Sequence, residues 1–170
     1  METVDYYELA QITTREQFVA RCPFPFFVGA DVLKRPTGPS QTVVHLEIDD
    51  SKTPTRAPPP VEAARPLVLP VRKVQPVFPS MISIGRTNNN DVVVPDVQVS
   101  KVHAYVRTTE GQLEISDAGS RNGTWVAGER LQPKGPPRVL LSGERVRFGT
   151  LEFVFFANDV CWSRLRVWRK

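Results

Sequence analysis

From Leu67 onward the chain is a series of short apolar segments separated by turns, many of which contain glycine. Compact Gly-containing pairs such as Glu110-Gly111 and Ala127-Gly128 separate neighbouring segments, as expected for β-hairpins. The predicted strands are 67–74, 81–85, 92–94, 102–108, 112–116, 124–126, 129–131, 138–141, 144–148 and 151–157. Such a series is typical of a β-sandwich that displays functional residues on loops at one end. Proline at position 70 places the first strand at a sheet edge.

The first 48 residues have a different pattern. Residues 1–22 read as two short helices, with Thr13 and Glu16 at the spacing of a capping box. The stretch 24–33 is aromatic and extended in character, and 42–48 alternates between apolar and polar residues. We therefore predict a small α+β extension, a helix plus a hairpin, over 1–48. It is too short to form an independent core, so it docks either on the main domain or on a partner.

Two further segments complete the predicted organisation. Residues 49–66 have the proline-rich composition of a semi-rigid linker. Residues 158–170 read as a short basic C-terminal helix, with Cys161, Leu165 and Trp168 on one face. The predicted domains are thus 1–48, 49–66, 67–157 and 158–170.

Three short motifs stand in order within the strand-rich part of the chain: Gly85-Arg86, Ser100-x-x-His103 and Asn122-Gly123. Their order and separations resemble the forkhead-associated (FHA) family, whose members read phosphothreonine in partner proteins. The resemblance covers about residues 67–157. It implies an FHA-like antiparallel β-sandwich and a phosphopeptide-binding function.

A phosphothreonine side chain carries about −1.5 to −2 charge and three acceptor oxygens at neutral pH, so its site needs several donors in place. Arg86 offers a forked guanidinium, and Ser100 offers a hydroxyl and a backbone amide. Lys101 adds a mobile positive charge, and Gly85 lets the backbone turn without a Cβ penalty.

The resemblance assigns a role to each of these positions. It implies that Arg86 and Ser100 contact the phosphate, with Lys101 beside them, and that Asn122 holds the ligand backbone. Arg121 is either a second phosphate contact or rim charge. Gln98 stands at a position that helps to select the residue three after the phosphothreonine. The expected structural positions are Gly85, His103, Gly123 and Thr124, with His103 bracing the loop.

Catalysis is not expected. His103 follows Ser100 closely, but no third group completes a catalytic triad, and no glycine-rich phosphate loop with its lysine is present. Cys22 and Cys161 stand far apart, without a zinc-binding spacing, so no metal or other cofactor is predicted. The aromatic residues 125, 148, 153 and 155 are expected in the sandwich core rather than on a base-stacking surface.

Charge and composition limit the partners. Residues 67–170 carry 15 basic and 9 acidic side chains, which suits an anionic ligand but does not demand nucleic acid. No run approaches the ~18 apolar residues of a membrane span. The N-terminus lacks the layout of a secretory signal, so we expect a cytoplasmic, reducing location and no membrane partner.

The leading hypothesis is therefore a phosphothreonine-dependent adaptor that binds a protein phosphorylated by an upstream Ser/Thr kinase. One alternative is a structural or assembly module that does not read phosphate. Another is nucleic-acid binding through the basic tail, residues 164, 166, 169 and 170, although no nucleic-acid partner is expected. A further hypothesis is that Thr53 or Thr55, once phosphorylated, supplies a ligand for the site in this chain or in a second copy.

Overall fold

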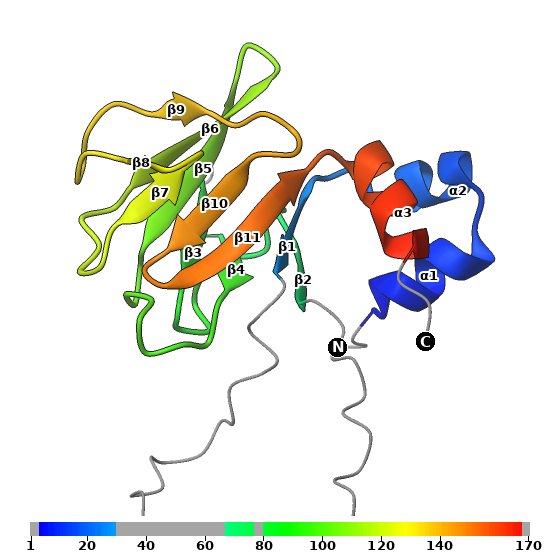
Figure 1. The fold of residues 1–170 in the computed structure, drawn as a ribbon, viewed down its shortest axis with the longest axis horizontal. Coiled ribbons are helices and arrows are strands. Elements are labelled where there is room, and N and C mark those ends of the chain that lie inside the picture. The colour runs from blue at the N-terminus through cyan, green and yellow to red at the C-terminus, as the bar shows by residue number, and fades with distance from the viewer. Residues whose placement is uncertain (1–3, 30–66, 77–79, 168–170) are drawn as a thin grey trace, which may run out of the picture.

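The computed structural model describes residues 4–29, 67–76 and 80–167, which form two β-sheets packed face to face and a group of three helices (Figure 1). The six-stranded sheet contains β1 (Phe26–Gly29), β2 (Leu67–Pro70), β7 (Thr124–Val126), β8 (Glu129–Arg130), β10 (Arg145–Phe148) and β11 (Leu151–Phe156). The five-stranded sheet contains β3 (Ile82–Gly85), β4 (Val92–Val93), β5 (Ala104–Thr109), β6 (Gln112–Asp117) and β9 (Arg138–Val139). The predicted β-sandwich is confirmed.

The strand order is β2-β1-β11-β10-β7-β8 in the first sheet and β4-β3-β5-β6-β9 in the second. Neighbouring strands are antiparallel except for β3 and β4, which are parallel with Ile84 opposite Val92. The edge position predicted for the strand that contains Pro70 is confirmed, since β2 has only one neighbour in its sheet. Proline is tolerated there because it has no N–H to donate to a second neighbour.

Two of the hairpins have turns of only two residues. Glu110 and Gly111 both have positive φ angles, 51° and 78°, and Ala127 and Gly128 likewise have 50° and 89°. Two consecutive positive φ angles are the backbone of a type I′ turn, whose twist matches that of the flanking strands. Each turn therefore joins β5 to β6 or β7 to β8 with only two residues.

Alternating side chains of both sheets meet in the core of the sandwich. Phe27, Phe148 and Phe153 are almost fully buried there, together with Ile84 and Ile115 of the facing sheet. The rings of Phe27 and Phe148 meet edge to face, with 5.5 Å between centroids. Burial of each such side chain contributes about 1.5–3 kcal/mol, so this layer fixes how the two sheets face each other.

Trp125 corrects one prediction. Its strand neighbours Thr124 and Val126 are fully buried, whereas Trp125 points to the opposite, outer face and is only half-buried. Successive residues of a strand alternate between the two faces, so the side chain between two core residues must point outward. The other three aromatic residues expected in the core, at 148, 153 and 155, do lie there.

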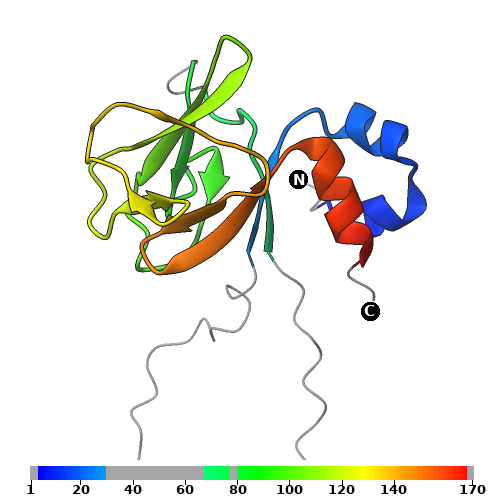
Figure 2. The ribbon, with the colours of Figure 1, turned by 45° about the horizontal axis from the view of Figure 1, so that its top comes forward.

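The three helices come from the two ends of the chain. Helices α1 (Tyr6–Ile12) and α2 (Arg15–Arg21) pack against α3 (Asn158–Val167), beside the end of the sandwich where β11 runs into α3 (Figure 2). The buried face predicted for the C-terminal helix is present in Cys161 and Leu165. These residues share a second apolar cluster with Phe18, and with Phe26 and Phe156 from the outer face of the sheet.

The capping box at the start of α2 lies one residue later than predicted. The Thr14 hydroxyl accepts the Gln17 amide at 3.3 Å, and Gln17 Oε1 accepts the Thr14 amide at 3.1 Å. The Thr13 hydroxyl instead donates to the Leu9 carbonyl at 2.6 Å, at the end of α1. Glutamine serves as well as glutamate in this motif, which is why the sequence contained two overlapping candidates.

The six-stranded sheet contains residues from both sides of the boundary predicted at residue 67. Strand β1 comes from the segment assigned to the N-terminal extension, yet it pairs with β2 on one side and β11 on the other, with Phe27 opposite both Leu69 and Phe155. The first 29 residues therefore supply both a strand of the sandwich and two helices against it. The predicted strand 42–48, the linker 49–66 with Thr53 and Thr55, and Trp168 lie outside the described residues.

Candidate functional site

The predicted phosphate and specificity residues come together around one hollow of about 230 Å³, which lies at the end of the sandwich where β3 finishes. Eight residues line it: Arg86, Val97, Gln98, Val99, Ser100, Lys101, Arg121 and Asn122. They come from three loops, those that follow β3, precede β5 and precede β7. All five predicted phosphopeptide contacts and Gln98 are among them, while Gly85, His103, Gly123 and Thr124 lie behind this lining.

Gly85 is required because two loops cross directly above it. A Cβ atom at this position would lie 2.2 Å from the Lys101 carbonyl oxygen and 2.8 Å from Asn90 Nδ2. The same Asn90 nitrogen donates to the Lys101 carbonyl at 2.7 Å, and the Arg86 amide donates to the Ser100 carbonyl at 2.9 Å. The absence of a side chain at Gly85 therefore lets the Ser100–Lys101 loop lie against the end of β3.

His103 joins two of the three loops from beneath. Its ring is fully buried; Nδ1 accepts the Ser100 amide at 3.0 Å, and Nε2 lies 3.1 Å from the Gly123 carbonyl. Because Nδ1 is an acceptor, the proton of the neutral ring sits on Nε2 and is donated to Gly123. Burial lowers the pKa of His103 below its usual value, which favours this neutral form.

The Ser100 amide is thus bonded to the His103 ring, so of the two groups that Ser100 offers, the hydroxyl is the one left for a ligand in this structure. The Ser100 hydroxyl can still act as a hydrogen-bond donor. Ser100 Oγ accepts the Arg121 amide at 3.0 Å, and its own hydrogen is left to donate. The neighbouring loop therefore turns the Ser100 hydroxyl into a donor for an acceptor in the hollow.

Three cations surround the hollow: Arg86, Lys101 and Arg121, all of them exposed. Arg86 Nε donates to the Val99 carbonyl at 3.2 Å, which orients the guanidinium. Within the described residues, no hydrogen bond or ion pair engages its two terminal nitrogens, and none engages the side chains of Lys101 and Arg121. These donors are therefore free to bind an anion that carries several acceptor oxygens.

Asn122 and Gln98 form a connected pair on the rim. Asn122 Nδ2 donates to the Gln98 carbonyl at 2.8 Å and to Gln98 Oε1 at 3.0 Å. Both hydrogens of the Asn122 amide group are thereby used, and Oδ1 remains to accept from a ligand N–H. Asn122 was expected to hold the ligand backbone and Gln98 to select a flanking residue. Their hydrogen bonds show that each side chain fixes the position of the other.

Asp117 holds the third loop and was not singled out from the sequence. Its carboxylate accepts the amides of Gly119 and Ser120, each at 2.8 Å, and the hydroxyls of Ser120 and Thr124, each at 2.6 Å. Burial by itself raises the pKa of Asp117, but these hydrogen bonds outweigh burial and lower it. An Asp two residues before a glycine is the available sequence signal, because aspartate accepts amides two or three residues on.

A second buried carboxylate, Asp91, secures the loop after β3. It accepts the amides of Val74 at 2.7 Å, Gln75 at 2.6 Å and Ser83 at 2.8 Å, and it forms an ion pair with Lys73 at 2.9 Å. Although burial opposes ionisation, these contacts hold the pKa of Asp91 well below its usual range. The partners come from separate segments, so no local motif reveals them.

The FHA domain model matches residues 82–149, the span that contains all three motifs and the hollow. The chain contains an FHA domain. The hollow described above is formed by loops of this FHA domain, and the resemblance seen in the sequence is confirmed.

Similar proteins include a Mycobacterium tuberculosis ABC transporter ATP-binding/permease protein, 32% identical over 75% of this chain and 15% of the transporter. The oxoglutarate dehydrogenase inhibitor of Corynebacterium efficiens is 40% identical over 44% of this chain and 49% of the inhibitor. The N-terminal FHA domain of Saccharomyces cerevisiae Rad53p, solved with a phosphothreonine peptide, is 25% identical, with a TM-score of 0.42 over 49% of this chain and 73% of that one. The chain thus matches at most about half the length of either curated relative.

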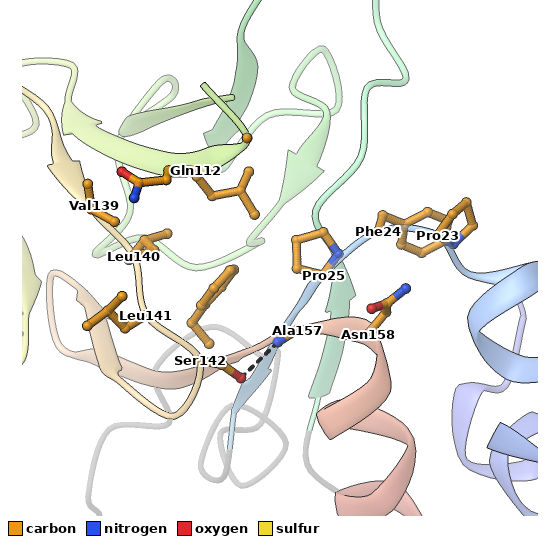
Figure 3. Close-up of a pocket in the computed structure, with 13 residues that line it drawn as sticks. Pro23, Phe24, Pro25, Gln112, Val139, Leu140, Leu141, Ser142, Ala157 and Asn158 are labelled. Carbon is orange, nitrogen blue, oxygen red and sulfur yellow. Dashed lines mark hydrogen bonds between the residues drawn. The ribbon is translucent and has the colours of Figure 1, made fainter. Parts of the chain in front are cut away.

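A second hollow, of about 370 Å³, lies at the opposite end of the sandwich, where β5 and β11 finish. It is bounded by the connection from α2 to β1, the β5–β6 turn, and the segments 139–142 and 157–158, with Ser142 Oγ accepting the Ala157 amide at 3.0 Å (Figure 3). Its lining is mostly apolar, including Phe24, Leu140 and Leu141, and contains no charged side chain. Of these two hollows, the one at the loop end is the one lined by cations.

Among the described residues, no helix combines the length and the hydrophobicity needed to cross a membrane.

Proposed function

We propose that this protein is a phosphothreonine-dependent adaptor in Ser/Thr kinase signalling, in which Arg86 and Ser100 hold the phosphate. One observation carries the proposal: three uncommitted cations and an oriented serine hydroxyl meet at a single hollow of the FHA domain. A phosphoryl group brings about two negative charges and three acceptor oxygens, which match this set of donors. Loss of the phosphate leaves the cations without a partner, so binding is gated by phosphorylation.

Each lining residue then has a distinct role. The two terminal nitrogens of Arg86 give a forked contact to phosphate oxygens, and the Ser100 hydroxyl donates to a third. Lys101 and Arg121 add charge from either side. Asn122 accepts a ligand backbone N–H through Oδ1, and Gln98, which fixes that amide, also faces the residues that follow the phosphothreonine.

The partner is a protein that an upstream Ser/Thr kinase has phosphorylated on threonine. The chain acts on it as a non-catalytic, cytoplasmic binding module. The relative named as an inhibitor of oxoglutarate dehydrogenase supports a regulatory role exerted through binding. Membership of the FHA family supports phosphothreonine as the ligand.

Calorimetry with a degenerate phosphothreonine peptide pool, and with its unphosphorylated and phosphoserine counterparts, tests the proposal. We expect micromolar binding to the phosphothreonine pool and weakening by at least about tenfold in Arg86→Ala, since hydrogen bonds to charged groups contribute ~1.5–3 kcal/mol each. Arg86→Lys keeps the charge and removes the fork, so it should recover only part of the affinity.

The matched control is Arg107→Ala in β5, because Arg107 does not line the hollow and pairs with Glu114 at 2.9 Å. It removes an exposed arginine without touching the hollow and should leave the affinity unchanged. Equal binding of phosphorylated and unphosphorylated pools would reject the proposal and favour a phosphate-independent assembly module.

A further inference from the structure

A row of three side chains crosses the outer face of the six-stranded sheet next to the phosphate hollow. Trp125 of β7 stands directly opposite Arg130 of β8 and Arg147 of β10, and residues directly opposite each other share one face. These three strands lie side by side at one edge of the sandwich, away from the helices, which pack beside β1, β2 and β11 (Figure 1). We refer to Arg130, Trp125 and Arg147 as the arginine–tryptophan row.

Both arginines lie over the indole ring. The guanidinium carbon of Arg147 is 4.2 Å from the ring centroid of Trp125, and that of Arg130 is 5.8 Å away. Stacking orders each guanidinium without consuming its charge, because the ring carries no counter-ion. Within the described residues neither arginine forms an ion pair or a hydrogen bond.

The neighbouring arginine on the same face behaves differently. Glu152 stands opposite Arg147 across the strands, yet its carboxylate forms an ion pair with Arg145 at 3.2 Å. Arg145 therefore has a carboxylate partner, whereas the two arginines of the row have none within the described residues. The surface offers two ordered, unpaired cations separated by an aromatic ring.

The row is continuous with the phosphate hollow. A Cβ atom at Gly123 would lie 2.7 Å from Arg130 Nε, so the Arg130 side chain rests directly on the backbone of Gly123. The preceding residue, Asn122, lines the hollow. A peptide that leaves the hollow across Asn122 meets Arg130 first, and then the indole and Arg147.

We infer that the arginine–tryptophan row binds an acidic segment of the same partner that places its phosphothreonine in the hollow. This inference rests on the proposed function and adds to it the chemistry of the flanking sequence. The partner is a protein whose phosphothreonine is accompanied, a few residues away, by glutamate or aspartate. Arg130 and Arg147 form charge-assisted hydrogen bonds with those carboxylates, at positions that the phosphate contacts do not reach.

The test uses the full chain and three kinds of peptide: phosphothreonine with a four-glutamate block, phosphothreonine with a four-glutamine block, and unphosphorylated threonine with the glutamate block. Each block is placed before or after the threonine in separate pools. We expect the acidic phosphorylated pool to bind about fivefold more tightly than the neutral one for one placement, as two partly exposed ion pairs predict. In the Arg130→Gln/Arg147→Gln variant the ratio should fall to about one, whereas Arg107→Gln should keep it.

Two failures are distinguishable. Equal binding of the acidic and neutral phosphorylated pools overturns the inference and leaves the proposed function standing. If the two acidic pools bind equally with and without the phosphate, the neutral phosphorylated pool does not bind, and the double variant abolishes the binding, the row is supported as an acidic-segment site while the proposed function fails. Binding of a random RNA or DNA duplex through the same two arginines, without a response to the glutamate block, would overturn the inference in favour of nucleic acid.

Discussion

The Ser100 amide and the His103 ring are joined by a hydrogen bond of 3.0 Å, and the other nitrogen of that ring reaches the Gly123 carbonyl. One buried side chain therefore sets the distance between the loop that carries Ser100 and Lys101 and the loop that carries Arg121 and Asn122. The site therefore depends on a residue that is itself fully buried.

We predict that His103→Gln destabilises the fold and weakens phosphopeptide binding together. Glutamine can place its amide group near the position of Nε2 but has no acceptor at the position of Nδ1, so at least one buried partner is left unsatisfied, which costs about 1–3 kcal/mol. Urea denaturation gives the free energy of unfolding, and calorimetry gives the affinity. An unchanged unfolding free energy would show that the ring does not brace these loops.

The pH dependence of stability should carry the signature of the same ring. Burial lowers the pKa of His103 in the folded chain, whereas an unfolded histidine titrates near ~6.5. Above that pH the His103 ring is neutral in both the folded and the unfolded chain, and its full contribution to the free energy of unfolding is present. As the pH falls below it, the unfolded chain takes up a proton that the folded chain resists, and stability is lost until the pH passes the folded pKa.

Denaturation between pH 7.5 and 5 should therefore show a decline that His103→Gln reduces. The chain has one other histidine, His45, and the same experiment on His45→Gln assigns the slope to one ring. Measuring unfolding rather than peptide affinity avoids confusion with the phosphate group, whose second pKa is also about 6.

Replacement of Gly85 should be more damaging than replacement of an exposed glycine. In Gly85→Ala the new methyl group would meet the Lys101 carbonyl, so β3 and the Ser100–Lys101 loop must separate. We expect a loss of at least about 2 kcal/mol, as for other overpacked sites, and a loss of peptide binding. Gly111→Ala meets no atom within 4 Å but must adopt a positive φ angle, which costs about 1–2 kcal/mol. Thermal unfolding compares the two, and binding should survive only in Gly111→Ala.

Ser100→Ala isolates the hydroxyl from the loop geometry. The amide of residue 100 still bonds to His103, so the fold should be retained, while the donor to phosphate and the acceptor for the Arg121 amide are lost. We expect phosphothreonine affinity to fall by about tenfold or more, since a hydrogen bond to a charged group is worth ~1.5–3 kcal/mol. Full affinity in this variant would assign phosphate binding to the cations alone.

The sequence predicted those features that are local. Turns such as Glu110-Gly111 and the alternation along each strand fixed most strand positions, and three motifs identified the loops that meet at the hollow. Side-chain alternation also contained the information that Trp125 points outward, but its size and hydrophobicity favoured the core. The position of the capping box could not be settled because Thr13 and Thr14 each precede a suitable partner by three residues.

Features that depend on distant partners could not be predicted. The neighbours of Asp91 and the pairing of β1 with β11 join segments that no spacing rule connects. The commitment of the Ser100 amide to His103, and of the Asn122 amide to Gln98, likewise requires knowledge of how the loops approach one another. Roles assigned to individual site residues consequently remain predictions until binding is measured.

The insertion of β1 between β2 and β11 determines how the protein can be shortened. A recombinant fragment that began at residue 67 would contain every motif of the FHA signature, yet it would leave the edge of β11 unpaired and remove Phe27 from the core. An open strand edge beside an exposed apolar layer favours aggregation. The smallest soluble fragment should therefore begin before Phe26. If a fragment starting at residue 67 is insoluble, that result does not test the phosphate site.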